Sequence, residues 1–289
     1  MASIRELRGR IKSVGNIKQI TRAMEMVATT KLRRFQERAV ASRPYAEEIA
    51  ALVGHLATVL GDDVEDRPLF NEGEGSKVAL LIVSSDRGLC GAYNSNLFKV
   101  YEAWRAEHPD TEVDLYVYGR KAYQYLSRQG HHVERYFHEP ELEKIDYRGA
   151  AAVSRTLVDA FLSGEYSGVE ILYTAFESMV RYVPRVVPFL PVQAVGGEEE
   201  SSTGADMILE PDPATIFDQL IPRYLETRIY NALLEALTSE YASRRVSMKN
   251  ATDAATDMQG VLKGIYNRKR QEIITKELLD IVGGAEALR

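Results

Sequence analysis

The sequence predicts the α/β fold class, with a long antiparallel coiled coil of N- and C-terminal helices plus a central α/β domain. Three observations lead to this prediction. Apolar residues recur at helical spacing over the first 60 residues, strand-like and helix-like segments alternate through the middle of the chain, and helical spacing returns from residue 213. The 289 residues, 45% hydrophobic and 27% charged, are enough to bury a substantial core.

The first coiled-coil helix is expected over residues 1–60. Its apolar side chains follow steps of three and four residues, beginning with Ile4, Leu7, Ile11 and Val14 and continuing to Leu60. This spacing is typical of a coiled-coil seam. Pro44 lacks a backbone donor and clashes with the preceding turn, so we expect a kink or break near Ser42–Tyr45.

The central α/β domain is expected over residues 77–195, after a linker at 61–76 that is rich in Gly and acidic residues. The expected strands are Lys77–Ser84, Glu112–Tyr118, His132–His138, Val169–Phe176 and Val180–Val192, and the expected helices are Asn94–Ala106, Arg120–Gln129 and Tyr147–Ser163. Strands that alternate with helices indicate a mostly parallel, Rossmann-like sheet with helices on its faces. Pro184, Pro188 and Pro191 place the last strand at an edge, because proline cannot donate to a central ladder.

The second coiled-coil helix is expected over residues 213–289, after a flexible loop at 196–212, and Gly283–Gly284 is expected to end it. Its segment Ser239–Met258 is rich in small polar residues, which allow a second helix to approach closely. A disordered loop is the alternative there, because Thr and Asn are poor helix formers. Each terminal helix carries a narrow apolar seam and a compact domain returns the chain near its start, so an antiparallel pair is expected.

Composition and charge exclude several classes of protein. A single cysteine, Cys90, forms no internal disulfide and excludes zinc sites of the CxxC type. No apolar run reaches the roughly 18 residues of a membrane span. The net charge of −6 conceals basic ends, because residues 1–43 hold 11 Lys/Arg against 3 Asp/Glu and residues 244–289 hold 9 against 6. Two basic ends indicate a common environment, which could be a nucleic acid, an acidic protein or a membrane surface.

The segment Ser84–Asn94 (SSDRGLCGAYN) follows a buried strand and precedes a helix, where α/β folds place ligand loops. It matches neither GxGxxG nor GxxxxGK[ST], so a structural tight turn is favoured over a phosphate loop. The alternative that stays open is a nucleotide-binding α/β protein that uses Asp86–Asn94.

Three further features have structural interpretations. Cys90 lacks a recognisable His partner and is interpreted as a buried structural thiol. His131, His132 and His138 lack metal-ligand spacing and are interpreted as a solvent-facing strand end. The basic run around Arg33–Arg34 resembles a nucleic-acid footprint, but the few aromatics, the absent helix-turn-helix spacing and the acidic chain overall favour an acidic protein partner.

Four segments resemble the gamma subunit of the rotary F-type ATP synthase, of the bacterial type. They are Ala23–Lys31 (AMEMVATTK), Ser84–Ala92 (SSDRGLCGA), Ser239–Asp253 and Tyr266–Leu288 (YNRKRQEIITKELLDIVGGAEAL), in the family's order along essentially the whole chain. The resemblance implies a central-stalk rotor subunit that turns inside the catalytic ring and couples transmembrane proton flow to ATP synthesis, or ATP hydrolysis to proton pumping. It also implies a chain with no catalytic residue, cofactor or metal of its own.

The resemblance further implies a set of partners and contact residues. The partners are the alpha and beta subunits of the ring, the epsilon subunit and the c-subunit ring, with no nucleic acid and with membrane contact, at the cytoplasmic face, only through the complex. The basic ends would meet acidic lever segments of the beta subunits. The residues expected to contact the ring are Met24, Met26, Lys31, Arg268, Arg270, Gln271, Thr275 and Glu277.

Overall fold

The computed structural model of the chain describes residues 3–64, 66–193 and 210–286. The chain divides into two compact units. The first, which we call the helix pair, comprises Met1–Thr29 and Arg244–Arg289, and the second, the sheet unit, comprises Thr30–Ser243. Two long helices, α1 (Ile4–Leu60) and α5 (Pro213–Glu286), contribute to both units. Most of the loop expected at 196–212 lies outside the described residues.

The sheet unit contains a five-stranded sheet with the order β3-β2-β1-β4-β5. Its strands are β1 (Lys77–Val83), β2 (Glu112–Tyr118), β3 (Val133–Phe137), β4 (Tyr166–Phe176) and β5 (Tyr182–Leu190). The first four run parallel, and β5 pairs antiparallel with β4. In this register Leu80 of β1 pairs with Leu115 on one side and with Glu170 on the other. The central position of β1 explains its continuous apolar run, because both of its faces are covered.

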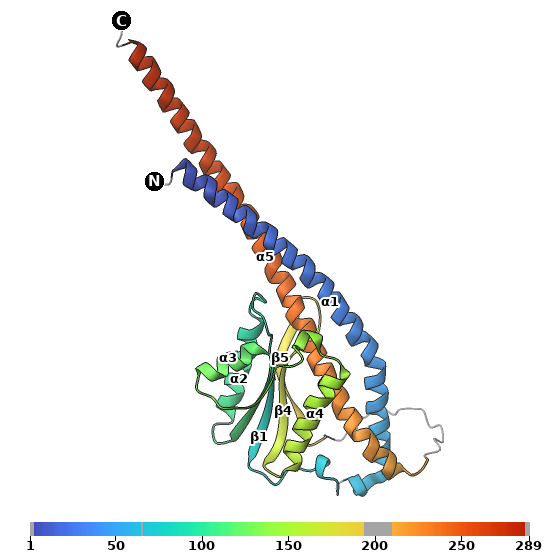
Figure 1. Cartoon of the computed structure of the whole chain (residues 1–289). Helices are drawn as coiled ribbons and strands as arrows, with labels where there is room; N and C mark the ends of the chain where they lie inside the picture. Colours follow the sequence, from blue (N-terminus) through green and yellow to red (C-terminus); the bar gives the residue numbers. More distant parts are fainter. Residues whose placement is uncertain (1–2, 65, 194–209, 287–289) are drawn as a thin grey trace. The chain divides into compact units, whose positions relative to one another are not determined.

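Helices cover both faces of the sheet (Figure 1). Helices α2 (Tyr93–Glu107) and α3 (Arg120–Arg128) lie on one face, and α4 (Tyr147–Leu162) lies on the other with the sheet-unit parts of α1 and α5. The core beneath α2 and α3 consists of Leu80, Ile82, Leu97, Tyr101, Trp104, Leu115, Val117, Ala122, Leu126 and Leu172. Each fully buried side chain of this kind stabilises the fold by about 1.5–3 kcal/mol, before entropy is counted.

Polar contacts attach α4 and α5 to this unit. The Asp146 carboxylate caps α4 by accepting from the Gly149 N–H at 2.8 Å. Glu226 of α5 is buried and lies between Arg155 of α4 and Arg223, at 3.1 and 3.3 Å. A buried carboxylate is tolerated when cations and hydrogen bonds satisfy it, so this pairing joins the two helices.

The expected elements of the α/β region are present, with bounds shifted by at most three residues. The last strand, β5, lies at a sheet edge as its prolines predict. The stretch expected to be a linker contains two 3₁₀ turns, η1 (Gly61–Val64) and η2 (Pro68–Phe70). The segment 239–258 is helical throughout, so the disordered alternative for it is wrong.

The helix end expected at Gly283–Gly284 is wrong, and of the kink or break expected near Ser42–Tyr45 the break is wrong. Helix α1 is not broken at Pro44, and α5 continues through Gly283–Gly284 to Glu286. Proline removes the single hydrogen bond that its own N–H would make to the Val40 carbonyl, while the bonds of the neighbouring turns remain. Glycine lowers helix stability by about 1 kcal/mol relative to alanine, which weakens a helix without ending it.

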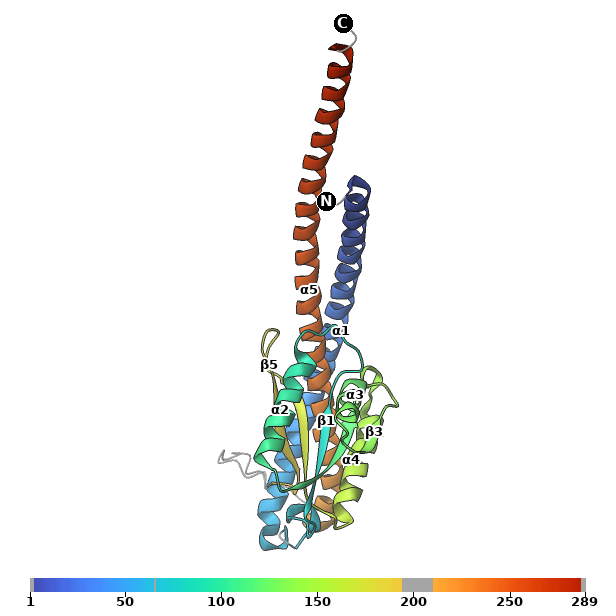
Figure 2. The ribbon, with the colours of Figure 1, turned by 90° about the vertical axis from the view of Figure 1, so that its left-hand side faces the viewer.

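Within the helix pair, the N-terminal part of α1 lies beside α5 in both views, and the C-terminal end of α5 extends past the start of α1 (Figures 1 and 2). Two cross-helix hydrogen bonds define their direction: Arg8 Nη2 to the Tyr266 hydroxyl at 3.0 Å, and Thr252 Oγ1 to Thr21 Oγ1 at 2.8 Å. Residue numbers rise along one helix as they fall along the other, so the two helices are antiparallel, as predicted.

Candidate functional site

The polar groups of the loop after β1 form hydrogen bonds within the protein. Asn94 spans it, because its Oδ1 accepts from the Ser85 N–H at 3.2 Å and its Nδ2 donates to Ser85 Oγ at 2.8 Å. The Asp86 carboxylate accepts from the backbone N–H groups of Arg120 and Leu142, both at 3.1 Å. These donors and acceptors of the loop therefore bind other groups of the protein itself.

Backbone geometry supports the same interpretation of the loop. Leu89 and Gly91 adopt positive φ angles of 63° and 57°, which close a tight turn. Directly after the neighbouring strand β2, Gly119 has φ 100°, and a Cβ there would lie 2.1 Å from the Ser84 carbonyl oxygen. The structure favours the structural turn, and the nucleotide-binding alternative for Asp86–Asn94 is not favoured.

The thiol and histidine clusters lie where the sequence places them. Cys90 is buried, as expected, and Asn94 Nδ2 lies 3.3 Å from its sulfur. His131, His132 and His138 are all exposed around β3, as expected of a strand end. Among residues 3–64, 66–193 and 210–286, no group of three or more His, Cys, Asp or Glu side chains is arranged to hold a metal ion.

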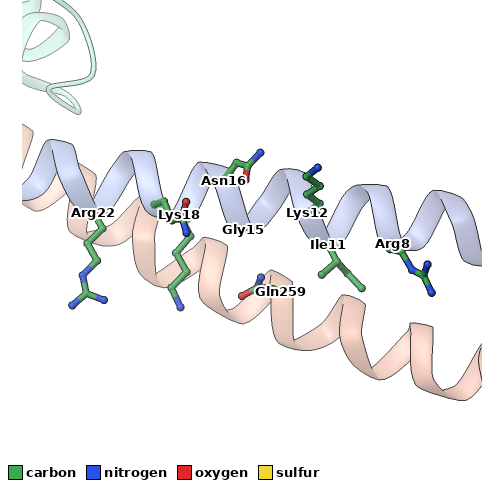
Figure 3. Close-up of a pocket in the computed structure, with 9 residues that line it drawn as sticks. Arg8, Ile11, Lys12, Gly15, Asn16, Lys18, Arg22 and Gln259 are labelled. Carbon is green, nitrogen blue, oxygen red and sulfur yellow. The ribbon is translucent and has the colours of Figure 1, made fainter.

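The helix pair carries a groove of about 560 Å³ along α1 (Figure 3). The residues that line it are Arg8, Ile11, Lys12, Gly15, Asn16, Lys18, Gln19, Arg22 and Gln259. Four of these described residues are cationic and none is acidic. In Figure 3 Gln259 points from α5 toward the α1 backbone at Gly15, with Lys18 and Arg22 farther along α1 on one side and Ile11 and Arg8 on the other.

Gly15 explains the close approach at the middle of this groove. A Cβ at that position would lie 3.0 Å from Gln259 Nε2, so a side chain there would displace the glutamine. At one end of the groove the Tyr266 hydroxyl accepts a hydrogen bond from Arg8, which raises the pKa of Arg8 and lowers the pKa of Tyr266. Arg8 therefore contributes a permanent positive charge to the groove.

The basic excess of residues 1–43 is evident from the sequence, but this groove is not. The signal was the i, i+4 spacing of Arg8 with Lys12 and of Lys18 with Arg22, on either side of Gly15. Residues four apart share one helix face, so both pairs reinforce one positive surface. Across the helix pair, residues 1–29 and 244–289 carry 15 Lys/Arg against 8 Asp/Glu.

Seven of the eight expected ring-contact residues belong to the helix pair. Met24 is half-buried and Met26 is 59% exposed, and the expected contact residues of α5 are all exposed: Arg268, Arg270, Gln271, Thr275 and Glu277. Several large apolar side chains beside them are also exposed, namely Ile273, Ile274, Leu278, Leu279, Ile281 and Val282. An apolar and polar helix surface of this extent is typical of a protein interaction site.

Lys31 is the exception among these residues. It belongs to the sheet unit, and its ammonium group forms an ion pair with the Glu143 carboxylate. The structure thus does not bring Lys31 into the same unit as Met24 and Met26. Its role in contacting a ring stays a prediction.

Long helices with exposed apolar and charged side chains, in a chain that also folds an α/β unit, are typical of proteins that act by contacting other proteins. The part of the chain that the structure describes contains no helix long and apolar enough to cross a membrane. Comparison with known proteins identifies the family within this class.

The family model described as ATP synthase matches residues 3–288. The chain is 38% identical to the ATP synthase gamma chain of Geotalea uraniireducens over 100% of both chains, and 41% identical to that of Mycobacterium tuberculosis over 99% of this chain and 98% of the relative. In a mitochondrial ATP synthase structure from Euglena gracilis, a chain 18% identical has the same fold, with TM-score 0.65 and coverage of 99% and 94%. The chain belongs to the family of ATP synthase gamma chains, the central-stalk rotor subunits of F-type ATP synthase.

Proposed function

We propose that this chain turns inside a ring of alpha and beta subunits and couples transmembrane proton flow to ATP synthesis from ADP and phosphate, or ATP hydrolysis to proton pumping. The observation that carries the proposal is the surface of the helix pair, which combines a basic groove with exposed apolar side chains on a chain of this family. In this role the chain contributes contact surface and asymmetry, and the chemistry occurs on other subunits.

The asymmetry of the helix pair supports this mechanism. The groove follows α1, whereas the exposed apolar and polar residues near the end of α5 lie on the other helix. A turning rotor of this kind presents a different surface to each catalytic site in turn. Each orientation then favours one conformation of that site through differential contact, which is a population shift.

We also propose which partners meet this chain. The Tetrahymena thermophila structure that shares the fold, 23% identical with TM-score 0.57 over 80% of this chain and 99% of the other, is of a central stalk and c-ring. Contact with a c-subunit ring and an epsilon subunit is proposed for this chain on that basis and on the family resemblance. Membrane association then arises only through the complex, at the cytoplasmic face.

The contact residues proposed for the ring are Met24, Met26, Arg268, Arg270, Gln271, Thr275 and Glu277, together with the cations of the groove. Because the groove has no acidic lining residue among those described, acidic segments of the beta subunits complement it. Each exposed charge pair contributes about 0.2–1 kcal/mol, which permits contacts to form and break during rotation.

Reconstitution tests the proposed function. Purified alpha and beta subunits are mixed with the full chain, and ATP hydrolysis and co-elution are measured against a mixture without it. We expect the chain to co-elute with the ring and to increase its ATPase activity. Absence of both effects would contradict the proposal.

Charge neutralisation tests the groove. In the double variant Lys18→Gln/Arg22→Gln we expect the affinity for the ring to fall by about two- to fivefold for each lost pair at low salt, and by less at high salt. The matched control is Arg5→Gln/Arg10→Gln, which removes two cations from the same helix outside the groove. Equal loss in both variants would show that net charge, and not the groove, determines binding.

A further inference from the structure

A short segment between β3 and α4 is anchored to the sheet unit. It contains the 3₁₀ turn η3 (Leu142–Lys144), and the Leu142 and Ile145 side chains are buried. The Leu142 N–H also donates to Asp86 Oδ2 at 3.1 Å, in the loop that follows β1. The segment is therefore held to the sheet by apolar anchors and by a charge-assisted hydrogen bond.

Between its two apolar anchors, this segment presents Glu143 to both long helices. One carboxylate oxygen forms an ion pair with Lys31 of α1, and the other accepts from the Tyr241 hydroxyl of α5 at 2.6 Å. The Lys31 ammonium group also lies 5.6 Å from the centre of the Tyr241 ring, and that ring packs on Phe35 at 5.3 Å. One carboxylate thus accepts from one donor on each helix, and the two donor side chains contact each other.

A second contact joins the same three elements two turns farther along α1. Arg38 Nη2 donates to the Ile145 carbonyl oxygen at 2.5 Å and to the Tyr230 hydroxyl of α5 at 3.2 Å. Lys31 and Arg38 are seven residues apart, so they face the same side of α1. The segment therefore connects α1 and α5 at two levels.

The Lys31–Glu143 ion pair is partly buried, and Glu143 is ionised. The Lys31 and Glu143 side chains are 31% and 27% exposed, so neither is fully hydrated nor fully desolvated. Burial by itself raises the pKa of Glu143, but the hydrogen bonds from Lys31 and Tyr241 outweigh it and hold the pKa below its usual value. The group is therefore a carboxylate at neutral pH.

We propose that Glu143 is a positioning residue of the rotor, which clasps α1 to α5 through Lys31 and Tyr241 and ties both helices to the sheet. This inference rests on the proposed function, and it assigns Lys31 to the clasp in place of a ring contact. Apolar packing is non-directional. Hydrogen bonds with defined angles hold the two helices in one register while torque acts on them.

A charge exchange separates the clasp from a ring contact. The variants Lys31→Glu, Glu143→Lys and the double variant with both changes are each assembled into the complete complex in vesicles. We expect each single variant to pump about two- to fivefold fewer protons per ATP hydrolysed. This is the factor by which the loss of one partly exposed ion pair changes an equilibrium. The double variant restores the pair in reverse and recovers the wild-type ratio.

If Lys31 instead contacts the ring, the double variant stays as defective as Lys31→Glu, because position 31 still carries a negative charge, and the clasp is refuted. A matched control is Arg181→Glu/Glu177→Arg, an exposed pair of the same unit with side chains 73% and 44% exposed. Neither its singles nor its double should change the pumping ratio.

Two further measurements, on the Tyr241→Phe variant and on the wild-type complex, test the clasp separately from the proposed function. Tyr241→Phe removes one hydroxyl but keeps the ring on Phe35, so the chain folds and the pumping ratio falls by a smaller factor than in Glu143→Lys. An unchanged ratio in this variant would count against the clasp. The wild-type complex distinguishes the two proposals: if it shows no ATP-driven pumping the proposed function fails, and if it pumps but the exchange gives no recovery, the clasp alone fails.

Discussion

The sheet unit and the helix pair use the same two helices in opposite ways. In the sheet unit most apolar side chains of α1 and α5 are buried, as Phe35 at 1% exposed and Leu233 at 0% illustrate. In the helix pair a few, such as Leu7 at 5%, are buried, but more of them are exposed, with Ile20 at 59% and Leu279 at 67%. One apolar periodicity therefore serves an internal core in one region and an external surface in the other. Both regions share this periodicity, so the difference in side-chain exposure arises from which other elements pack against the helices in each region.

Charge separates the two regions as clearly as burial does. The helix pair carries 15 Lys/Arg against 8 Asp/Glu, whereas residues 30–243 carry 21 against 34. The basic excess of the helix pair includes the groove around Gly15, and the acidic excess belongs to the unit that folds around the sheet. The net charge of −6 for the whole chain thus hides two surfaces that attract different partners.

The largest expected effect comes from a core substitution in the sheet unit. Leu80 is 0% exposed at the centre of the sheet, and Leu80→Ala should lower the free energy of unfolding by about 2–5 kcal/mol through lost burial and a cavity. The matched substitution Ile20→Ala in the helix pair should change it by at most about 0.5 kcal/mol. Urea denaturation followed by the fluorescence of the single tryptophan, Trp104, and by circular dichroism measures both. Equal costs would erase the proposed difference between the regions.

A smaller effect is expected from two glycines of the helix pair. A Cβ at Gly9 meets nothing within 4 Å, so Gly9→Ala should stabilise this part of α1 by about 1 kcal/mol through helix propensity. Gly15→Ala should gain less, because Gln259 must move to admit the methyl group. Hydrogen exchange of the amides in residues 4–29 measures the two gains. The same gain at both positions would contradict the close approach of the helices at Gly15.

The smallest effect is a pH dependence within the sheet unit. The pKa of Glu143 is lower in the folded chain than its ordinary value, so the carboxylate stabilises the fold at neutral pH and this contribution is lost as pH falls through that lowered pKa. Wild type should exceed Glu143→Gln in unfolding free energy by less than about 1 kcal/mol at pH 7 and converge with it under acid conditions. Protection of the amides near Tyr241 should follow the same trend. A constant difference across this range would show that the charge of Glu143 contributes nothing.

Much of the fold could be predicted because its signals are local. Lys77–Val83 is an uninterrupted apolar run, which only a strand covered on both faces accommodates, and it became the central strand β1. The prolines of β5 exclude it from the middle of a sheet, and it lies at the edge. The contact residues proposed for the ring came from family motifs, since no local rule marks them.

The features that the sequence did not predict correctly depend on contacts with other parts of the chain. Pro44 and Gly283–Gly284 are local signals of interruption, yet the helices continue through them because neighbouring turns and contacts outweigh a cost of a few kcal/mol. Contacts near Pro44 show such support, since Ser42 Oγ donates to Asn231 Oδ1 of α5 at 3.0 Å. The clasp was not predictable, because Lys31, Glu143 and Tyr241 are distant in the chain.

By itself the sequence determined the element types, their order, the parallel sheet with an edge strand, the pairing direction of the terminal helices and the family. These follow from periodicity, proline chemistry and motif order, all of which act within a few turns or strands. Tertiary structure alone decided which apolar side chains are covered, that Gly15 opens a basic groove against Gln259, and that Lys31 pairs with Glu143. Burial and ion pairing depend on atoms that fold into contact from far along the chain, so no local pattern contains them.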